Sequence, residues 1–153
     1  MKYTLKLLGI ACLTTFTFSC NKSGSKVEVT DSLVGEWELR QTSAAMNPLV
    51  GNYPPGNGKI IKLTETRYSI YDGGQVVKQG EYNIVPDPDV ETSVCLVFPA
   101  GQFANRIIYD NDRTSEKQFF QITGNKLSIV AGCYAIDAGH RADYERVGSG
   151  SHN

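Results

Sequence analysis

Short stretches of alternating apolar and polar residues, separated by turn sequences, constrain the fold of this chain most strongly. In residues 35–40 (GEWELR), Trp37 and Leu39 point to one side and the charged residues to the other, as in a strand with one buried face. The pairs Gly73-Gly74 and Gly124-Asn125 each separate two such stretches in the manner of a tight hairpin turn. Helical spacing does not persist for more than about one turn after the first twenty residues. The pattern predicts an all-β domain.

Nine stretches qualify as strands, and most of them are joined by tight turns. Strands spaced in this way are typical of an all-β barrel or sandwich. In an antiparallel up-and-down β-barrel of eight or nine strands, pairing the first strand with the last removes both exposed edges, and we expect that architecture. The expected strands are residues 35–43, 59–65, 67–71, 75–85, 92–98, 105–109, 116–123, 126–131 and 141–147.

The first nineteen residues have the pattern of an export signal, with Lys2 and Lys6 preceding an uncharged apolar run. The run ends at Ser19-Cys20, which resembles the lipobox of bacterial lipoproteins. That resemblance implies cleavage before Cys20, acylation of this cysteine by fatty acids such as palmitate, and attachment to a membrane. The alternative is an ordinary secretion signal that leaves a free thiol. The chain then divides into a signal peptide (1–19), a lipidated cysteine with a polar tether (20–31), one domain (32–148) and a polar tail (149–153).

The residue after the cysteine gives an expectation about location. Lipoproteins that lack Asp at this place go to the outer membrane in many of the families that this chain resembles, and Asn21 fits that rule. We therefore expect a lipid-anchored protein of the cell envelope. The sequence leaves open whether it faces the periplasm or the cell surface.

Two cysteines remain in the expected domain, Cys95 and Cys133. An exported chain lies in an oxidising compartment, so the two are expected to form a disulfide. The alternative is a pair of buried thiols that do not meet.

The segment Gly35-Glu36-Trp37 resembles the Gly-x-Trp motif at the start of the first strand of lipocalins. That resemblance implies that Trp37 caps the closed end of the barrel and that Arg146, near the end of the last strand, packs across it. Residues 60–70 and 80–84 also resemble the small lipocalin-like lipoproteins of Bacteroidetes-type bacteria. The second lipocalin motif, Thr-Asp-Tyr, is absent.

A barrel of eight strands either fills its interior with side chains or holds one small ligand. If it holds a ligand, we expect Tyr68, Tyr82, Phe98 and Phe120 to line the cavity. The long connection 44–58 contains three prolines and three glycines, which exclude helix and central strand. It is either a flap over the open end, with ligand contacts from Tyr53 and Leu49, or a surface loop packed by its own side chains.

Residues with catalytic or metal-binding chemistry do not gather in a recognised pattern. His140 has Asp137 and Asp143 nearby, but no nucleophile motif accompanies it. The acids at 87, 89 and 91 lack the spacing of a calcium loop. We expect neither an enzyme nor a metal or other cofactor. The formal net charge of −1, with both signs mixed along the chain, indicates no nucleic-acid partner.

Two functions are consistent with this sequence. The first is a lipid-anchored envelope protein that binds a small apolar or amphipathic molecule inside the barrel. The second is a non-enzymatic interaction module, an inhibitor or assembly lipoprotein, whose packed barrel carries working loops at 44–58, 86–91 and 99–104. The protein partner is not indicated by the sequence.

Overall fold

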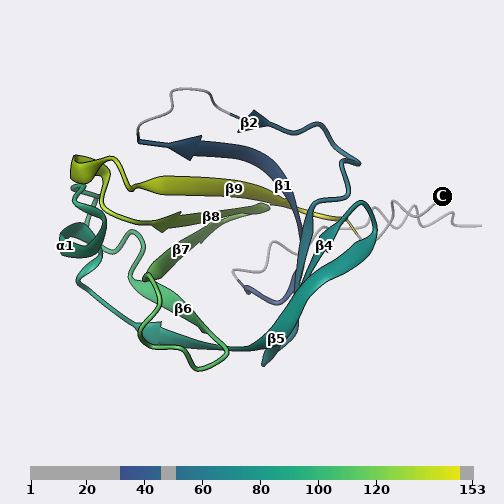
Figure 1. Cartoon of the computed structure of the whole chain (residues 1–153), viewed down its shortest axis with the longest axis horizontal. Coiled ribbons are helices and arrows are strands. Elements are labelled where there is room, and N and C mark those ends of the chain that lie inside the picture. Colours follow the sequence, from purple (N-terminus) through teal and green to yellow (C-terminus); the bar gives the residue numbers. More distant parts are fainter. Residues whose placement is uncertain (1–31, 46–50, 149–153) are drawn as a thin grey trace, which may run out of the picture.

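A computed structural model describes residues 32–45 and 51–148, which form a closed antiparallel β-barrel (Figure 1). Eight strands make the barrel, and the short β2 is an additional strand paired with β1. The elements are β1 (Gly35–Ala44), β2 (Gly51–Asn52), β3 (Ile60–Leu63), β4 (Arg67–Asp72), β5 (Gln75–Pro86), α1 (Val90–Val94), β6 (Asn105–Tyr109), β7 (Gln118–Thr123), β8 (Lys126–Ala131), η1 (Tyr134–Ile136) and β9 (His140–Arg146).

The barrel closes because β1 pairs with β3 on one edge and with β9 on the other. The β1–β9 register runs from Trp37 opposite Arg146 to Ala44 opposite His140, with a bulge between Leu39 and Gln41. From β3 to β9 each strand pairs with its neighbours in sequence. The predicted all-β, up-and-down antiparallel barrel is therefore confirmed, and the hairpin at Gly73-Gly74 has the positive φ angles, 57° and 80°, that its turn requires.

One predicted strand is wrong. Residues 92–98 do not form a strand, and α1 covers Val90–Val94 instead. The buried residues of α1 are Val90 and Val94, which lie four positions apart and so share one face of a helical turn. A short apolar run is ambiguous between strand and helix, and here the i, i+4 spacing decides it.

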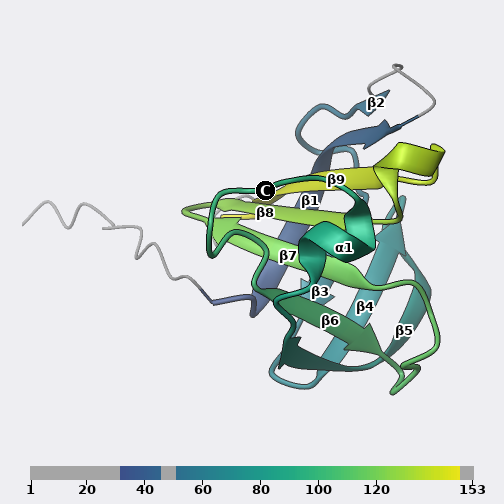
Figure 2. The same ribbon diagram turned by 90° about the vertical axis from the view of Figure 1, so that its left-hand side faces the viewer.

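Apolar side chains form two separate clusters, one inside the barrel and one outside it. The outer cluster lies where α1 packs against the outer face of β7 and β8 (Figure 2). Consecutive residues of a strand point to opposite faces of the barrel wall. Phe119 belongs to the outer cluster, and Phe120 packs against the inner one. The inner cluster comprises Leu33, Trp37, Ile61, Leu63, Tyr68, Tyr82, Ile107, Leu127 and Ile129, and the outer cluster comprises Val90, Val94, Phe103, Phe119 and Val130.

A disulfide links the outer cluster to the connection between β8 and β9. The sulfurs of Cys95 and Cys133 lie 2.02 Å apart, at bonding distance. Cys95 follows α1 and Cys133 precedes η1, so the bond fixes the two short helices to each other on the outside of the barrel.

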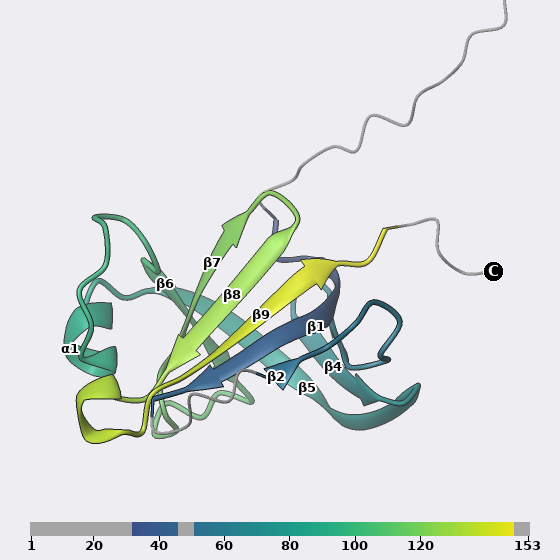
Figure 3. The same ribbon diagram turned by 90° about the horizontal axis from the view of Figure 1, so that it is seen from above.

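One end of the barrel is sealed by Trp37, which has no exposed surface. Its indole N–H donates a hydrogen bond to the Leu33 carbonyl oxygen at 2.8 Å, and the Arg146 guanidinium lies 4.0 Å from its ring centroid. Arg146 also donates to the carbonyl oxygens of Val34 and Ser32, at 2.8 and 2.6 Å. Residues 32–34 therefore close this end, which we call the sealed end. The start of β1 and the end of β9 both lie there, away from α1 (Figure 3).

Candidate functional site

The interior of the barrel contains a hollow of about 230 Å³, away from Trp37. Seven of the eight barrel strands, all except β1, contribute to its lining, which identifies it as part of the barrel lumen. Lys78 in its lining is exposed, so the hollow reaches the surface on that side. We call it the lumen hollow. It is lined by Ile61, Tyr68, Ile70, Lys78, Tyr109, Gln118, Ile129, His140, Ala142 and Tyr144.

A second hollow of about 200 Å³ shares the side chains of Ile61, Ile70 and Tyr144 with the first. Val77 lies in its lining because β5 has a register shift there, with Ile70 opposite Lys78 but Tyr71 opposite Val76. Such a bulge redirects side chains at the rim of a barrel. The linings of the two hollows mix aliphatic side chains with tyrosines and with charged or other polar groups.

Two tyrosines in the lining of the lumen hollow stack against each other. The rings of Tyr68 and Tyr109 meet edge to face, with centroids 4.7 Å apart. The Tyr68 hydroxyl donates a hydrogen bond to Asp110 Oδ2 at 2.7 Å. Burial, and then this bond to the carboxylate, raise the pKa of Tyr68. Tyr68 therefore stays protonated, as a fixed part of the wall.

Gly80 allows the wall to be this close-packed. A Cβ atom at Gly80 would lie 1.9 Å from Asp110 Oδ1 and 2.9 Å from Tyr68 Cε1. The same carboxylate accepts the Glu81 backbone N–H at 3.1 Å, so the turn after β6 is joined to β5. Only glycine leaves room for that turn and the Tyr68 ring together.

The Tyr109 and Tyr144 hydroxyls differ from the Tyr68 hydroxyl in their hydrogen bonding. Within residues 32–45 and 51–148 neither hydroxyl has a hydrogen-bond partner, and neither oxygen is shut off from solvent. Burial raises the pKa of both groups, and for Tyr109 the neighbouring Tyr144 adds to the effect. Both are therefore neutral hydroxyls, each able to donate one hydrogen bond and accept others in the lumen hollow.

Three further polar side chains complete the lining. Lys78 Nζ lies 5.6 Å from the Tyr68 ring centroid and 6.0 Å from that of Tyr109. Gln118 begins β7 and His140 begins β9, so each lies at the rim of the lumen. His140 Nε2 lies 3.6 Å from Glu116 Oε2.

Of the residues predicted to bind a ligand, Tyr68 lines the lumen hollow. Tyr82 and Phe120 belong to or pack against the inner cluster but line neither hollow. The Tyr82 hydroxyl is already used within the fold, because it donates to the Thr64 carbonyl oxygen. These two residues support the barrel rather than the candidate site.

The placement of Phe98 inside the barrel is wrong. It packs in the outer cluster, with its ring centroid 4.8 Å from that of Phe103, because the segment that was expected to be a strand follows α1 instead. Tyr53 lines neither hollow, and Leu49 lies outside the described residues.

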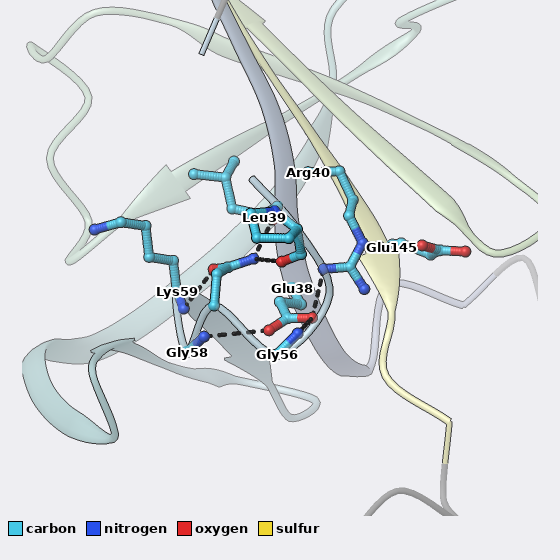
Figure 4. Close-up of polar contacts among 9 residues, drawn as sticks. Glu38, Leu39, Arg40, Gly56, Gly58, Lys59 and Glu145 are labelled. Atoms are coloured by element: carbon cyan, nitrogen blue, oxygen red, sulfur yellow. Dashed lines mark hydrogen bonds and ion pairs between the residues drawn. The ribbon is translucent and has the colours of Figure 1, made fainter. Parts of the chain in front are cut away.

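The described part of the long connection is held against β1 by Glu38 (Figure 4). The Glu38 side chain is buried, and its carboxylate accepts the backbone N–H groups of Gly56 and Gly58 at 3.1 and 3.2 Å. Arg40 donates to the same carboxylate and, at 2.9 Å, to Glu145 on β9. Residues 51–58 therefore pack along β1, and among the described residues of this connection Tyr53 lines neither hollow.

Hydrogen bonding also sets the charge state of Glu38. Burial alone would raise the pKa of its carboxyl, but the hydrogen bonds from Arg40, Gly56 and Gly58 outweigh burial and hold the pKa below its ordinary value. Glu38 is thus an ionised, fully bonded side chain with a structural role.

The sequence reasoning missed Lys78, Tyr109 and Gln118 as lining residues and treated His140 only as a loop residue. One signal was present. Lys78, Gly80 and Tyr82 alternate along β5, so a strand that turns Tyr82 inward turns Lys78 inward as well. The contribution of Tyr109 depends on where the turn after β6 folds, which no local pattern gives.

No protein-family model, curated protein or solved structure matches this chain in the comparisons made. Among the residues that the structure describes, none of the helices has the length and apolar character needed to cross a membrane. Cys20, the expected lipidation site, lies outside the described residues.

Proposed function

We propose that the protein is a lipid-anchored envelope protein that binds a small amphipathic molecule in the lumen hollow. One observation carries this proposal. Two tyrosines, Tyr109 and Tyr144, whose hydroxyls have no partner among the described residues, line a partly apolar space inside a closed barrel. Small-molecule sites typically combine an apolar lining with a few well-placed polar groups.

The dimensions of the space limit the ligand. Typical pockets for drug-sized ligands measure about 300–1,000 Å³, and each of the two hollows here is smaller, at about 230 and 200 Å³. A single-ring or short-chain compound fits such a space, whereas a long-chain lipid does not. Apolar side chains from β3, β4 and β8 would surround its body.

The envelope location is supported by the sequence and by the cysteine pair. The first twenty residues have the pattern of a lipoprotein signal that ends at Cys20. Cys95 and Cys133 form a disulfide, as exported chains in an oxidising compartment commonly do. Mass measurement of the denatured protein, purified from a bacterial envelope, tests this part, because acylation adds the mass of the fatty acids and cleavage removes residues 1–19.

Native mass spectrometry of the same preparation tests the carrier function. We expect a discrete adduct of small mass that is lost on denaturation. A Tyr109→Phe/Tyr144→Phe double variant should bind less of it, because it removes two hydroxyls and keeps the shape. Tyr82→Phe is the matched control, since its hydroxyl is bonded within the fold. An unliganded wild type that takes up nothing from a panel of small aromatic and aliphatic compounds would contradict the carrier function.

The second candidate, an interaction module, is favoured by a different observation. The disulfide joins the loop after α1 to the segment that contains η1, and both carry exposed apolar side chains: Leu96 at 40%, Val97 at 87% and Ile136 at 73% exposure. Exposed apolar patches of this kind often mark protein contacts. Replacing Val97 and Ile136 by Ser should abolish capture of a partner if this candidate is correct and should leave small-molecule uptake unchanged.

A further inference from the structure

Lys78 is placed at the lumen by the geometry of β5. It pairs with Ile70 next to the register shift, and both side chains line the lumen hollow. Its Nζ lies over the rings of Tyr68 and Tyr109, at 5.6 and 6.0 Å from their centroids. Attraction to these aromatic faces favours this position of the ammonium group beside the hollow, on the exposed side of the lining.

Lys78 differs from three other lysines of the domain in its partners. Lys59, Lys62 and Lys117 each have a carboxylate oxygen within 2.7–2.9 Å. Among the described residues, no carboxylate lies within ion-pair distance of Lys78. The charge at the lumen hollow is therefore not neutralised by a partner of its own.

The carboxylates near the lumen hollow are already bonded to other groups. Asp110 accepts hydrogen bonds from the Tyr68 hydroxyl and from the Glu81 backbone N–H. Glu116 lies beside His140 and does not line the hollow. Asp72 pairs with Lys59 at the second hollow. No acidic side chain is among the lining residues of the lumen hollow itself.

We propose that the lumen hollow selects an amphipathic carboxylate. The ammonium of Lys78 pairs with the carboxylate, and the free hydroxyls of Tyr109 and Tyr144 donate hydrogen bonds to oxygen atoms of the ligand. The apolar body of the ligand lies against Ile61, Ile70 and Ile129. This inference rests on the proposed carrier function and adds the charge of the ligand to it.

Calorimetric titration with two ligands of equal size tests the charge preference. The probes are 4-phenylbutyrate and 4-phenylbutyramide, which differ in the charged carboxylate only. We expect the wild-type protein to bind the acid about tenfold more tightly than the amide, the effect of one charge-assisted hydrogen bond at a partly exposed site. Lys78→Gln should remove this difference by weakening the acid alone, and Lys78→Arg should keep it.

Lys126→Gln is the matched control, because it removes the same charge from the start of β8, outside the lumen hollow. It should leave both affinities unchanged. Equal affinity of the wild type for acid and amide would overturn the charge preference and leave the carrier function standing. Binding of neither probe would overturn the carboxylate proposal, and the native mass measurement would then decide separately whether the barrel carries any ligand.

Discussion

Each end of the barrel interior places a cation over an aromatic ring, but the two ends differ in how their polar groups are bonded. At the sealed end, the Trp37 N–H and the Arg146 guanidinium are bonded to backbone carbonyl groups of residues 32–34. At the lumen hollow, Tyr109 and Tyr144 keep hydroxyls without a partner among the described residues, and Lys78 lacks a carboxylate there. Polar groups without a protein partner add little to stability, so under the proposed carrier function these groups would serve ligand binding.

Of the changes that test this comparison, removal of Trp37 should have the largest effect on stability. Trp37→Ala deletes a fully buried side chain and its hydrogen bond to Leu33, which should lower the free energy of unfolding by about 3–5 kcal/mol. Urea unfolding at neutral pH measures the loss. A loss of less than about 1 kcal/mol would mean that the sealed end does not hold the barrel closed.

Removing the disulfide should have the next largest effect. It spans 38 residues, and its loss in a Cys95→Ser/Cys133→Ser variant should cost up to about 4 kcal/mol in the chain-entropy model. Because the bond lies on the outer cluster, amide hydrogen exchange should speed up first in α1 and η1. Equally fast exchange of β1 and β9 would show that the disulfide supports the sealed end directly.

The carboxylate of Glu38 should make stability depend on pH in a particular direction. Its pKa is lowered in the folded state, so its contribution is complete above its ordinary pKa of 4.5 and is lost as the pH falls through the lower folded value. Glu38→Gln should cost about 1–2 kcal/mol at pH 7 and flatten the acid side of the stability profile. The pKa of Asp87 is also lowered, so the stability of the variant should still depend on pH in the acid range, but less steeply. Urea unfolding of the wild type and of Glu38→Gln at several pH values between 3 and 7 measures this effect. The same dependence of stability on pH in both proteins would contradict the role of Glu38.

The smallest effect is expected at the lumen hollow. Tyr109→Phe/Tyr144→Phe removes two hydroxyls that bond to no described residue, so the free energy of unfolding should change by less than about 0.5 kcal/mol. Thermal unfolding without ligand measures this, with Tyr82→Phe as the comparison that should lose more. A large loss in the double variant would mean that these hydroxyls serve the fold.

Much of the barrel could be predicted from the sequence because strand alternation and turn residues are local signals. The residues 35–40 and the hairpin at Gly73-Gly74 each carry such a signal, and the observed strands follow them closely. The contact of Trp37 with Arg146 was expected from a resemblance. The φ angle of +149° at Gly35, which a residue with a side chain rarely adopts, gives a physical reason for glycine at this position.

The remaining features depend on contacts between distant parts of the chain. Glu38 was predicted only as a residue on the polar face of a strand, and its burial arises because Gly56 and Gly58 fold onto it. Residues 92–94 of the predicted strand 92–98 are helical instead, since the outer face of β7 and β8 offers a surface for Val90 and Val94. The lumen hollow depends on the β-bulge between β4 and β5 and on the close packing at Gly80. No local sequence pattern predicts the geometry of either feature.

The hydrogen bond from Arg146 to Ser32 has a consequence for the order of folding. It joins residues separated by 114 positions, so the sealed end forms only after nearly the whole domain has left the ribosome or crossed a membrane. Folds that depend on such distant pairings form slowly, on the scale of milliseconds to seconds. Until β9 docks, β1 and β8 each present an unpaired edge, and the chain is open to wrong pairing with other chains. The seven residues of β9 therefore determine when the barrel can close, because closure requires their pairing with both β1 and β8.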